Sequence, residues 1–187
     1  IQTRDLLVMK ETVACKLNLE LACEDEVLDI ACNVRPEQIT LVPERREEVT
    51  TEGGLDVVGN RAKVEGAIQR LRDAGMIVSL FLDPDEAQIR AGSELEVDAV
   101  ELHTGMYSLA KAAVRQGELA KLANAGRLIR ELGMTLHAGH GLDYRNVKPI
   151  AAIEGMCELN IGHSIVGRSI MVGMQQAVRE MKQLITA

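Results

Sequence analysis

The residues best suited to chemistry in this sequence are its histidines, which stand at or near the ends of predicted β-strands. His137 and His140 lie within the stretch MTLHAGHG, and His163 closes a similar stretch, LNIGH. In both, an apolar run with strand character ends in glycine and histidine, and a helical pattern follows within a few residues. His103 stands near the end of a third apolar run. Because βα units place polar side chains at the carboxyl ends of their strands, the histidines predict a site where several strands end.

His140 is the best candidate for proton transfer, because it stands between two glycines. A tight turn at this point would direct its ring into a cleft, and imidazole changes its charge near neutral pH. His103 and His137 fit the simpler interpretation of hydrogen-bonded structural residues at strand ends. We expect no metal site, since the spacing of His137 and His140 on an extended segment puts their rings on opposite faces.

Two glutamates occupy matching positions in predicted strands. The segment 16–22 alternates strictly, with leucines on one face and Glu20 on the other, and Glu101 lies between Val100 and Leu102 in the same manner. In a closed barrel the apolar faces would meet the outer helices, and both carboxylates would point inward. Burial raises the pKa of a carboxyl group, which makes it a natural general acid or base. A structural ion pair, or a strand with one wet face, is the alternative for either residue.

Glycine turns in front of predicted helices offer places for an anion. Gly162 and His163 follow a strand and begin a helix, where free backbone N–H groups and the helix dipole favour a phosphate. Gly141 offers the same arrangement one βα unit earlier. Thr50 lies in the long polar loop 44–60, where its hydroxyl could close over a second anionic group. A plain solvent loop fits that stretch nearly as well.

The fold is predicted from a regular alternation of strands and helices. A helix precedes the first strand, and a helix follows each of the strands expected at 16–22, 38–43, 76–82, 98–105, 134–141 and 156–163. This alternation predicts a single α/β domain over residues 1–187 with a parallel sheet. An open doubly wound sheet is possible, but polar residues at several strand ends favour a (β/α)8 TIM barrel. Six of its eight βα units would then be present, and we expect the amino-terminal two to be absent. The helices at 108–132 and 164–185 are predicted to be long and continuous.

Composition narrows the class of partner and the compartment. A net charge of −7 and an aromatic content of 2% argue against nucleic-acid binding. Uncharged runs fall well short of the ~20 residues that span a bilayer, so no membrane segment is expected. The start of the sequence has no signal-peptide pattern, and its cysteines have neither disulfide-framework nor metal-ligand spacing. These features indicate a cytoplasmic protein.

Several stretches of the sequence resemble the pyridoxine 5′-phosphate synthase family of vitamin B6 biosynthesis. In the order of that family they are LNLE, LVPERREEVTTEGGLDV, SLFLD, ELHTG, HAGHGL and ELNIGHSIVGR. The resemblance implies a (β/α)8 barrel that forms a homo-octamer and uses neither a metal nor an organic cofactor. It also implies the condensation of two small phosphorylated substrates, 3-amino-2-oxopropyl phosphate and 1-deoxy-D-xylulose 5-phosphate. The products would be pyridoxine 5′-phosphate, inorganic phosphate and water.

The resemblance further implies roles for individual acid–base residues. Glu20 matches a general acid/base of the family, and His140 matches its proton-donating histidine. Glu101 matches a glutamate that assists charge development. Imine formation, dehydrations and ring closure require repeated proton transfer, which calls for several such groups in one water-excluded pocket.

The resemblance also implies substrate contacts. Thr50 matches a contact to the deoxyxylulose phosphate, whereas Gly141, Gly162 and His163 match contacts to the amino ketone. The family's Asn-x-Asp-His segment, a second catalytic histidine and further phosphate contacts belong to its first two βα units, which this sequence does not contain. A chain of only this length is expected to leave the barrel open and to be inactive.

Two other functions remain compatible with the residues alone. One is another aldolase or isomerase of phosphorylated sugars on the same barrel, which would turn over a single substrate. The other is a non-catalytic phosphate-ligand binder, or a remnant retained for assembly, which would bind without releasing phosphate.

Overall fold

A single parallel sheet whose strands follow one another in chain order organises the molecule. The computed structural model describes residues 1–43 and 53–186. The strands of the sheet are β1 (Asn18–Leu21), β2 (Gln38–Leu41), β3 (Ile77–Leu82), β4 (Ala99–His103), β5 (Thr135–Gly139) and β6 (Met156–Asn160). They pair in the order β1-β2-β3-β4-β5-β6, and every pair is parallel. The predicted alternation and parallel sheet are thereby confirmed.

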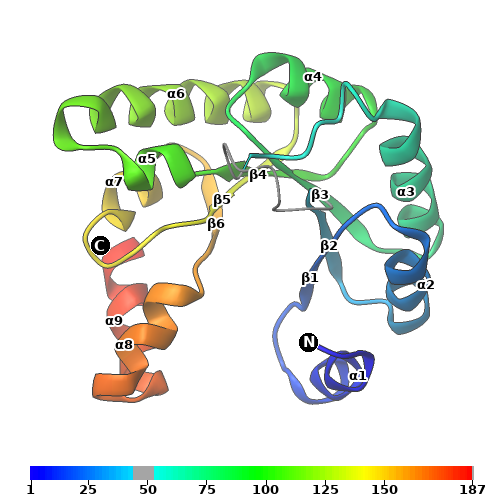
Figure 1. The fold of residues 1–187 in the computed structure, drawn as a ribbon, viewed down its shortest axis with the longest axis horizontal. Helices are drawn as coiled ribbons and strands as arrows, with labels where there is room; N and C mark the ends of the chain where they lie inside the picture. The colour runs from blue at the N-terminus through cyan, green and yellow to red at the C-terminus, as the bar shows by residue number, and fades with distance from the viewer. Residues whose placement is uncertain (44–52, 187) are drawn as a thin grey trace.

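Helices cover the outer side of this sheet, which curls into a half-barrel (Figure 1). They are α1 (Thr3–Thr12), α2 (Asp25–Val34), α3 (Arg61–Asp73), α4 (Glu86–Glu94), α5 (Gly105–Leu109), α6 (Ala112–Glu131), α7 (Val147–Ala151), α8 (His163–Val172) and α9 (Met174–Ile185). A doubly wound sheet reverses its strand order at a switch point. The described strands contain no such reversal, so the open doubly wound alternative is wrong for this part of the chain.

The hydrophobic core lies between the outer face of the sheet and the helices that cover it. Apolar strand residues such as Ile39, Leu80 and Leu136 are fully buried, and they pack with helix residues such as Leu71 and Ile129. Those helix residues recur at helical spacing, whereas the strand residues alternate with polar ones or form continuous apolar runs. Burying one such side chain contributes about 2 kcal/mol, so this layer holds the curvature of the sheet in place.

Two helices that the sequence predicts to be continuous are each broken in two. The predicted helix 108–132 is interrupted at Ala110, whose backbone is extended and whose carbonyl oxygen accepts from the guanidinium of Arg115 at 2.8 and 3.1 Å. The predicted helix 164–185 is interrupted at Gly173, where φ is 82°. Glycine adopts this left-handed backbone without strain, so it ends α8 and begins α9.

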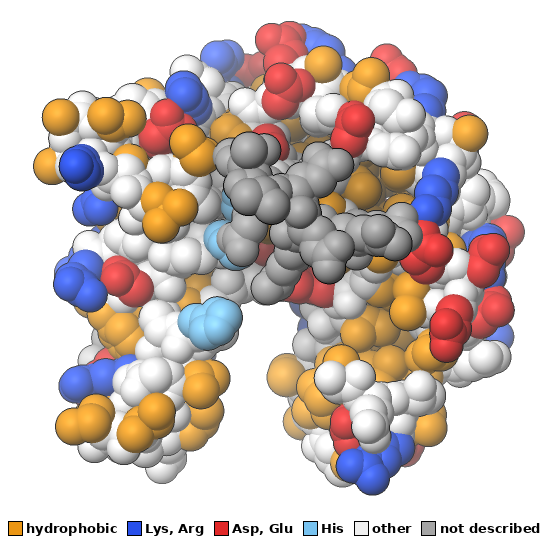
Figure 2. Space-filling model, viewed as in Figure 1, with side chains coloured by type: hydrophobic (Ala, Val, Ile, Leu, Met, Phe, Trp, Pro, Cys, Tyr) orange, Lys and Arg blue, Asp and Glu red, His pale blue; other side chains and the backbone are white. Residues whose placement is uncertain are grey.

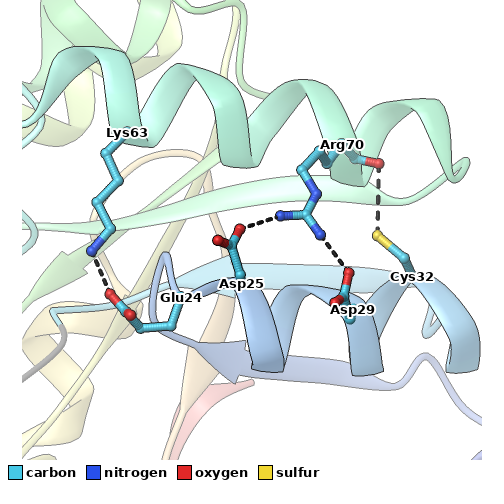
Figure 3. Close-up of polar contacts among 6 residues, drawn as sticks. All are labelled: Glu24, Asp25, Asp29, Cys32, Lys63 and Arg70. Atoms are coloured by element: carbon cyan, nitrogen blue, oxygen red, sulfur yellow. Dashed lines mark hydrogen bonds and ion pairs between the residues drawn. The ribbon is translucent and has the colours of Figure 1, made fainter.

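Exposed ion pairs join neighbouring helices on the outer surface. Between α2 and α3, Arg70 contacts Asp25 at 2.7 Å and Asp29 at 2.6 Å, and Lys63 pairs with Glu24 (Figure 3). Close by, the thiol of Cys32 lies 3.8 Å from the carbonyl oxygen of Arg70. Exposed pairs of this kind contribute about 0–1 kcal/mol each, so they set the register of the two helices more than the stability of the fold.

The two ends of the sheet leave more apolar side chains exposed to solvent than its middle does. Figure 2 shows a wide notch between an arm formed by α8 and α9 and an arm that carries α1. No residue of α8 is buried in the described structure, and Ile170 and Met171 are 82% and 80% exposed. Lys16, just before β1, pairs with Glu158 on β6 across the inside of the curl. In the described residues, no helix is both long and apolar enough to cross a membrane.

Candidate active site

Glu101 is a buried acid whose pKa is raised well above its ordinary value, and it lies in the middle of the sheet. Its side chain is buried in β4, and one carboxylate oxygen accepts from the amide of Asn160 at 2.6 Å. Burial raises the pKa of Glu101 to about 7, and the negative charge of Glu20 acts in the same direction. The hydrogen bond from Asn160 opposes this shift, and Glu158 adds a smaller upward contribution. A carboxyl group in this state can give or take a proton near neutral pH.

Glycine at position 139 makes room for this carboxylate. A Cβ atom added to Gly139 would lie 2.1 Å from Oε1 of Glu101 and 3.2 Å from Cβ of Asn160. Glu101 and His137 are opposite each other in the register of β4 and β5, so their side chains project from the same face of the sheet. Without a side chain at Gly139, the end of β5 leaves space for the acid of β4.

Glu20 and Glu101 share the inside of the curl, as the alternating pattern predicts. Glu20 is exposed at the end of β1, where the sheet is open, and its charge still raises the pKa of Glu101. Leu21, its neighbour, is buried on the helix side. The two acids therefore stand in different environments, which is the arrangement that separates a proton donor from a proton acceptor.

His140 lies just beyond β5, in a left-handed turn held by the end of β4. Its φ is 79° and that of Gly141 is 73°. The hydroxyl of Thr104 lies 2.6 Å from the carbonyl oxygen of His140 and 2.7 Å from that of Gly139. The predicted tight turn is confirmed. A left-handed backbone at a residue other than glycine is uncommon and is typical of functional sites.

A buried histidine of β4 packs against this turn. The rings of His103 and His140 are in T-shaped contact with their centroids 5.0 Å apart. His103 is 3% exposed on its side chain, and its Nδ1 lies 2.9 Å from Oδ1 of Asp83. This hydrogen bond holds the pKa of Asp83 below its ordinary value, assisted by the backbone N–H of Gly54 and opposed by burial. The structural role predicted for His103 is thus supported by a defined partner.

The glycine turns after β5 and β6 stand where the sequence predicts them. Gly162 is the N-cap of α8, and His163 is its first residue. Both are exposed, as is Gly141. The hydroxyl of Ser164 donates to the carbonyl oxygen of Leu142 at 2.8 Å, which ties the start of α8 to the turn after β5. Thr50, the other predicted substrate contact, lies outside the described residues.

The site also contains residues that the sequence analysis did not select. Thr104 fixes the His140 turn, and Asn160 holds Glu101. Asn160 lies within the LNIGH stretch, so its position in that strand was a signal that could have identified it. Asp83, the last residue of the SLFLD stretch, was not selected either. Among the residues that the structure describes, no cluster of three or more His, Cys, Asp or Glu side chains could hold a metal ion.

Structural neighbours share the fold at low sequence identity. A tryptophan synthase A-subunit from Pyrococcus furiosus aligns with a TM-score of 0.65 at 12% identity, covering 99% of this chain and 72% of the neighbour. A structure described as native KDPGal aligns with a TM-score of 0.61, also at 12% identity, over 99% of this chain and 76% of the neighbour. Such alignments indicate a common architecture and carry no statement about activity.

Sequence comparison identifies much nearer relatives. A pyridoxine 5′-phosphate synthase of Rhodopirellula baltica is 59% identical over 185 residues, covering 99% of this chain and 75% of the relative. A second, from Trichlorobacter lovleyi, is 55% identical over 186 residues, covering 99% of this chain and 78% of the relative. The family model for the pyridoxal phosphate biosynthesis protein PdxJ matches residues 1–187. With the strand-end acids and the histidine turn in place, the chain belongs to the PdxJ family.

Proposed function

We propose that this protein acts as a pyridoxine 5′-phosphate synthase in which Glu20, Glu101 and His140 transfer the protons. It condenses 3-amino-2-oxopropyl phosphate with 1-deoxy-D-xylulose 5-phosphate and releases pyridoxine 5′-phosphate, phosphate and water. The observation that carries the acid–base part is the buried Glu101, whose pKa is about 7. Such a group exists in both protonation states at neutral pH, as repeated proton transfer requires.

Glu101 and Glu20 take different parts in this proposal. The exposed carboxylate of Glu20 is the general acid/base, since it is open to substrate and solvent. Glu101 lies deeper, and its proton can neutralise charge as it develops on a bound intermediate. Asn160 fixes the direction of that proton through its 2.6 Å hydrogen bond.

His140 donates a proton from the next strand end. Its left-handed turn is anchored by Thr104, whose backbone N–H donates to the carbonyl oxygen of Gly139 at 2.9 Å and whose hydroxyl lies 2.6 Å from that of His140, so the backbone that carries the ring has little freedom. A ring held in this way spends little conformational entropy when a substrate arrives, which favours proton transfer over a short, fixed path.

The phosphorylated substrates bind at the turns that follow β5 and β6. Gly141, Gly162 and His163 contact the amino ketone, where the first free N–H groups of α8 and its helix dipole attract an anion. Thr50 contacts the deoxyxylulose phosphate in this proposal. The reaction needs neither a metal ion nor an organic cofactor, because its steps are proton transfers and eliminations.

The half-barrel closes with two further βα units to give an eight-stranded barrel. Three observations support this part of the proposal: the notch in Figure 2, the exposed apolar face of α8, and the one-sided pairing of β1 and β6 among the described strands. The relatives are also longer than this chain. Homo-octameric assembly, a cytoplasmic location and the lack of a nucleic-acid or membrane partner complete the proposal.

The decisive test is the two-substrate assay on the protein as its host makes it, after its intact mass has been measured. We expect product formation only when both substrates are present, and a Glu20→Gln variant should lose turnover by ~10²-fold or more. Turnover of either substrate alone would favour an aldolase or isomerase. Binding of both without release of phosphate would favour a non-catalytic binder. A loss of less than about threefold would remove Glu20 from the mechanism.

A further inference from the structure

Asp83, directly after β3, is linked to the ring of His140 through the ring of His103. Oδ1 of Asp83 lies 2.9 Å from Nδ1 of His103, and Oδ2 accepts from the backbone N–H of Gly54 at 3.0 Å. His103 in turn contacts the ring of His140 at a centroid distance of 5.0 Å and an interplanar angle of 65°. Three consecutive strand ends, β3, β4 and β5, are thus linked side by side.

We propose that Asp83 is a positioning residue that acts through His103 to hold the ring of His140 in its working orientation. This inference rests on the proposed function, in which His140 is the proton donor. In this proposal Asp83 transfers no proton to a substrate and acts only through His103.

The two contacts of Asp83 fix which nitrogen of His103 carries hydrogen. Gly54 presents an N–H donor to Oδ2, so that oxygen must accept. The carboxyl group of Asp83, whose ordinary pKa of 3.8 is not raised, is deprotonated at neutral pH and has only acceptors, so Oδ1 accepts as well. Nδ1 of His103 must therefore carry its hydrogen. A carboxylate that orients an imidazole in this manner is a recurrent device beside catalytic groups.

The His103 ring packs against two other rings. Its centroid lies 5.1 Å from that of Phe81 and 5.0 Å from that of His140. A Cβ atom added to Gly105 would be 2.5 Å from Nε2 of His103, so the ring fills the space that this glycine leaves open. With Nδ1 bound to Asp83 and Nε2 against Gly105, His103 forms a rigid wall for His140.

An Asp83→Asn variant separates positioning from simple packing, because it changes almost no volume. One amide oxygen cannot accept from both Gly54 and His103. If it keeps Gly54, the amide NH2 faces Nδ1 and drives His103 to the tautomer with hydrogen on Nε2. We expect kcat to fall by roughly tenfold or more with KM changed less than about threefold. The ¹⁵N spectrum of the His103 ring should show the exchanged tautomer.

Asp85→Asn is the matched control on the same loop. The Asp85 side chain caps α4 by accepting from the backbone N–H of Gln88 at 3.1 Å, and asparagine caps helices equally well. We expect kcat within about twofold of the wild type and an unchanged His103 spectrum. Equal losses of kcat in Asp83→Asn and Asp85→Asn would mean that both changes act by destabilising the loop, and the proposal would be wrong.

A second variant reaches the same ring without changing charge. Gly105→Ala places a methyl group beside Nε2 of His103, so we expect kcat to fall by a larger factor than KM rises. In Gly66→Ala the added methyl group has nothing within 4 Å, so this control should not show that loss of kcat. If Asp83→Asn keeps both full kcat and the wild-type spectrum, Asp83 does not position His103. If the wild-type enzyme makes no product, the proposed function fails. The spectrum of Asp83→Asn then decides this inference alone, and an unchanged tautomer overturns it.

Discussion

Polar side chains are buried in the middle of the sheet, whereas at its two ends polar and apolar side chains are exposed. In the middle of the sheet, Glu101 and His103 are buried and each has a hydrogen-bond partner, Asn160 for Glu101 and Asp83 for His103. At β1 and β6 the corresponding acid, Glu20, is exposed, and apolar residues of α8 face solvent. Described residues thus supply partners for Glu101 and His103, whereas β1 and β6 each pair with only one described strand. This contrast can be tested by changing one residue at a time.

The largest expected effect is on catalysis at the centre. Glu101→Gln keeps the side-chain volume, and its amide oxygen can still accept from Asn160, but it removes the titrating proton. We expect kcat in the complete enzyme to fall by about 10²–10⁴-fold. Steady-state kinetics with both substrates measures this. A loss below about threefold would show that burial of Glu101 serves the fold and not the reaction.

The same substitution should stabilise the fold in a defined pH range. Glu101 keeps its proton up to about pH 7 when folded, whereas the ordinary pKa is 4.5. Its favourable contribution is therefore complete below pH 4.5 and is lost as the pH rises through about 7. Above that range the free energy of unfolding of Glu101→Gln should exceed that of the wild type by up to roughly 3 kcal/mol. At about pH 4 we expect no such difference.

Urea unfolding at several pH values measures this difference, with the exposed Glu131→Gln as control. Glu131 pairs on the surface of α6 with Arg127 at 3.1 Å. We expect a change within about 0.5 kcal/mol at every pH for this control. A pH-independent difference between Glu101→Gln and the wild type would contradict the raised pKa.

Two glycine substitutions should change the stability of the fold by smaller amounts, and in opposite directions from each other. Gly139→Ala places a methyl group 2.1 Å from the Glu101 carboxylate, and we expect a loss of about 1–3 kcal/mol from overpacking. Gly117→Ala, inside α6, meets nothing within 4 Å and should gain about 0.5–1 kcal/mol from helix propensity. Thermal unfolding distinguishes the two. Equal shifts would mean that Gly139 is not a site of close approach.

The smallest effect is expected at the open end. Ile170 is 82% exposed on α8, so Ile170→Lys should change the unfolding free energy of this chain by less than about 0.5 kcal/mol. In a protein whose barrel is closed by further units, the same change should cost more, because that face is then covered. Unfolding of both forms measures the contrast, and identical small effects would argue against closure over α8.

Local patterns in the sequence were sufficient for the strands and for the positions of most candidate site residues. Strict alternation around Glu20 placed it inside the curl, and the glycines beside His140 predicted its turn. The two broken helices were missed for different reasons. Gly173 offered a signal within a strong apolar periodicity, whereas the break at Ala110 depends on a side-chain contact from Arg115.

Contacts between strand ends could not be predicted from local patterns. Thr104 and His140 are 36 residues apart in the chain, and Asn160 and Glu101 are 59 apart. Only the register of the folded sheet brings each pair together, because a hydrogen bond depends on distances of a few tenths of an ångström. For the same reason, the partner of His103 could not be identified before Asp83 was seen beside it.

The strand order has a consequence for how this protein is built during synthesis. From β2 onward, each described strand pairs with the strand immediately before it in the chain, so the edge it needs already exists when it leaves the ribosome. The sheet can grow one βα unit at a time, and each new helix can cover the strand that precedes it. Lys16 and Glu158, 142 residues apart, form a pair that must wait for the last strand. That ion pair would report the completion of the curl, and it provides a natural position for a pair of fluorescent labels that time it.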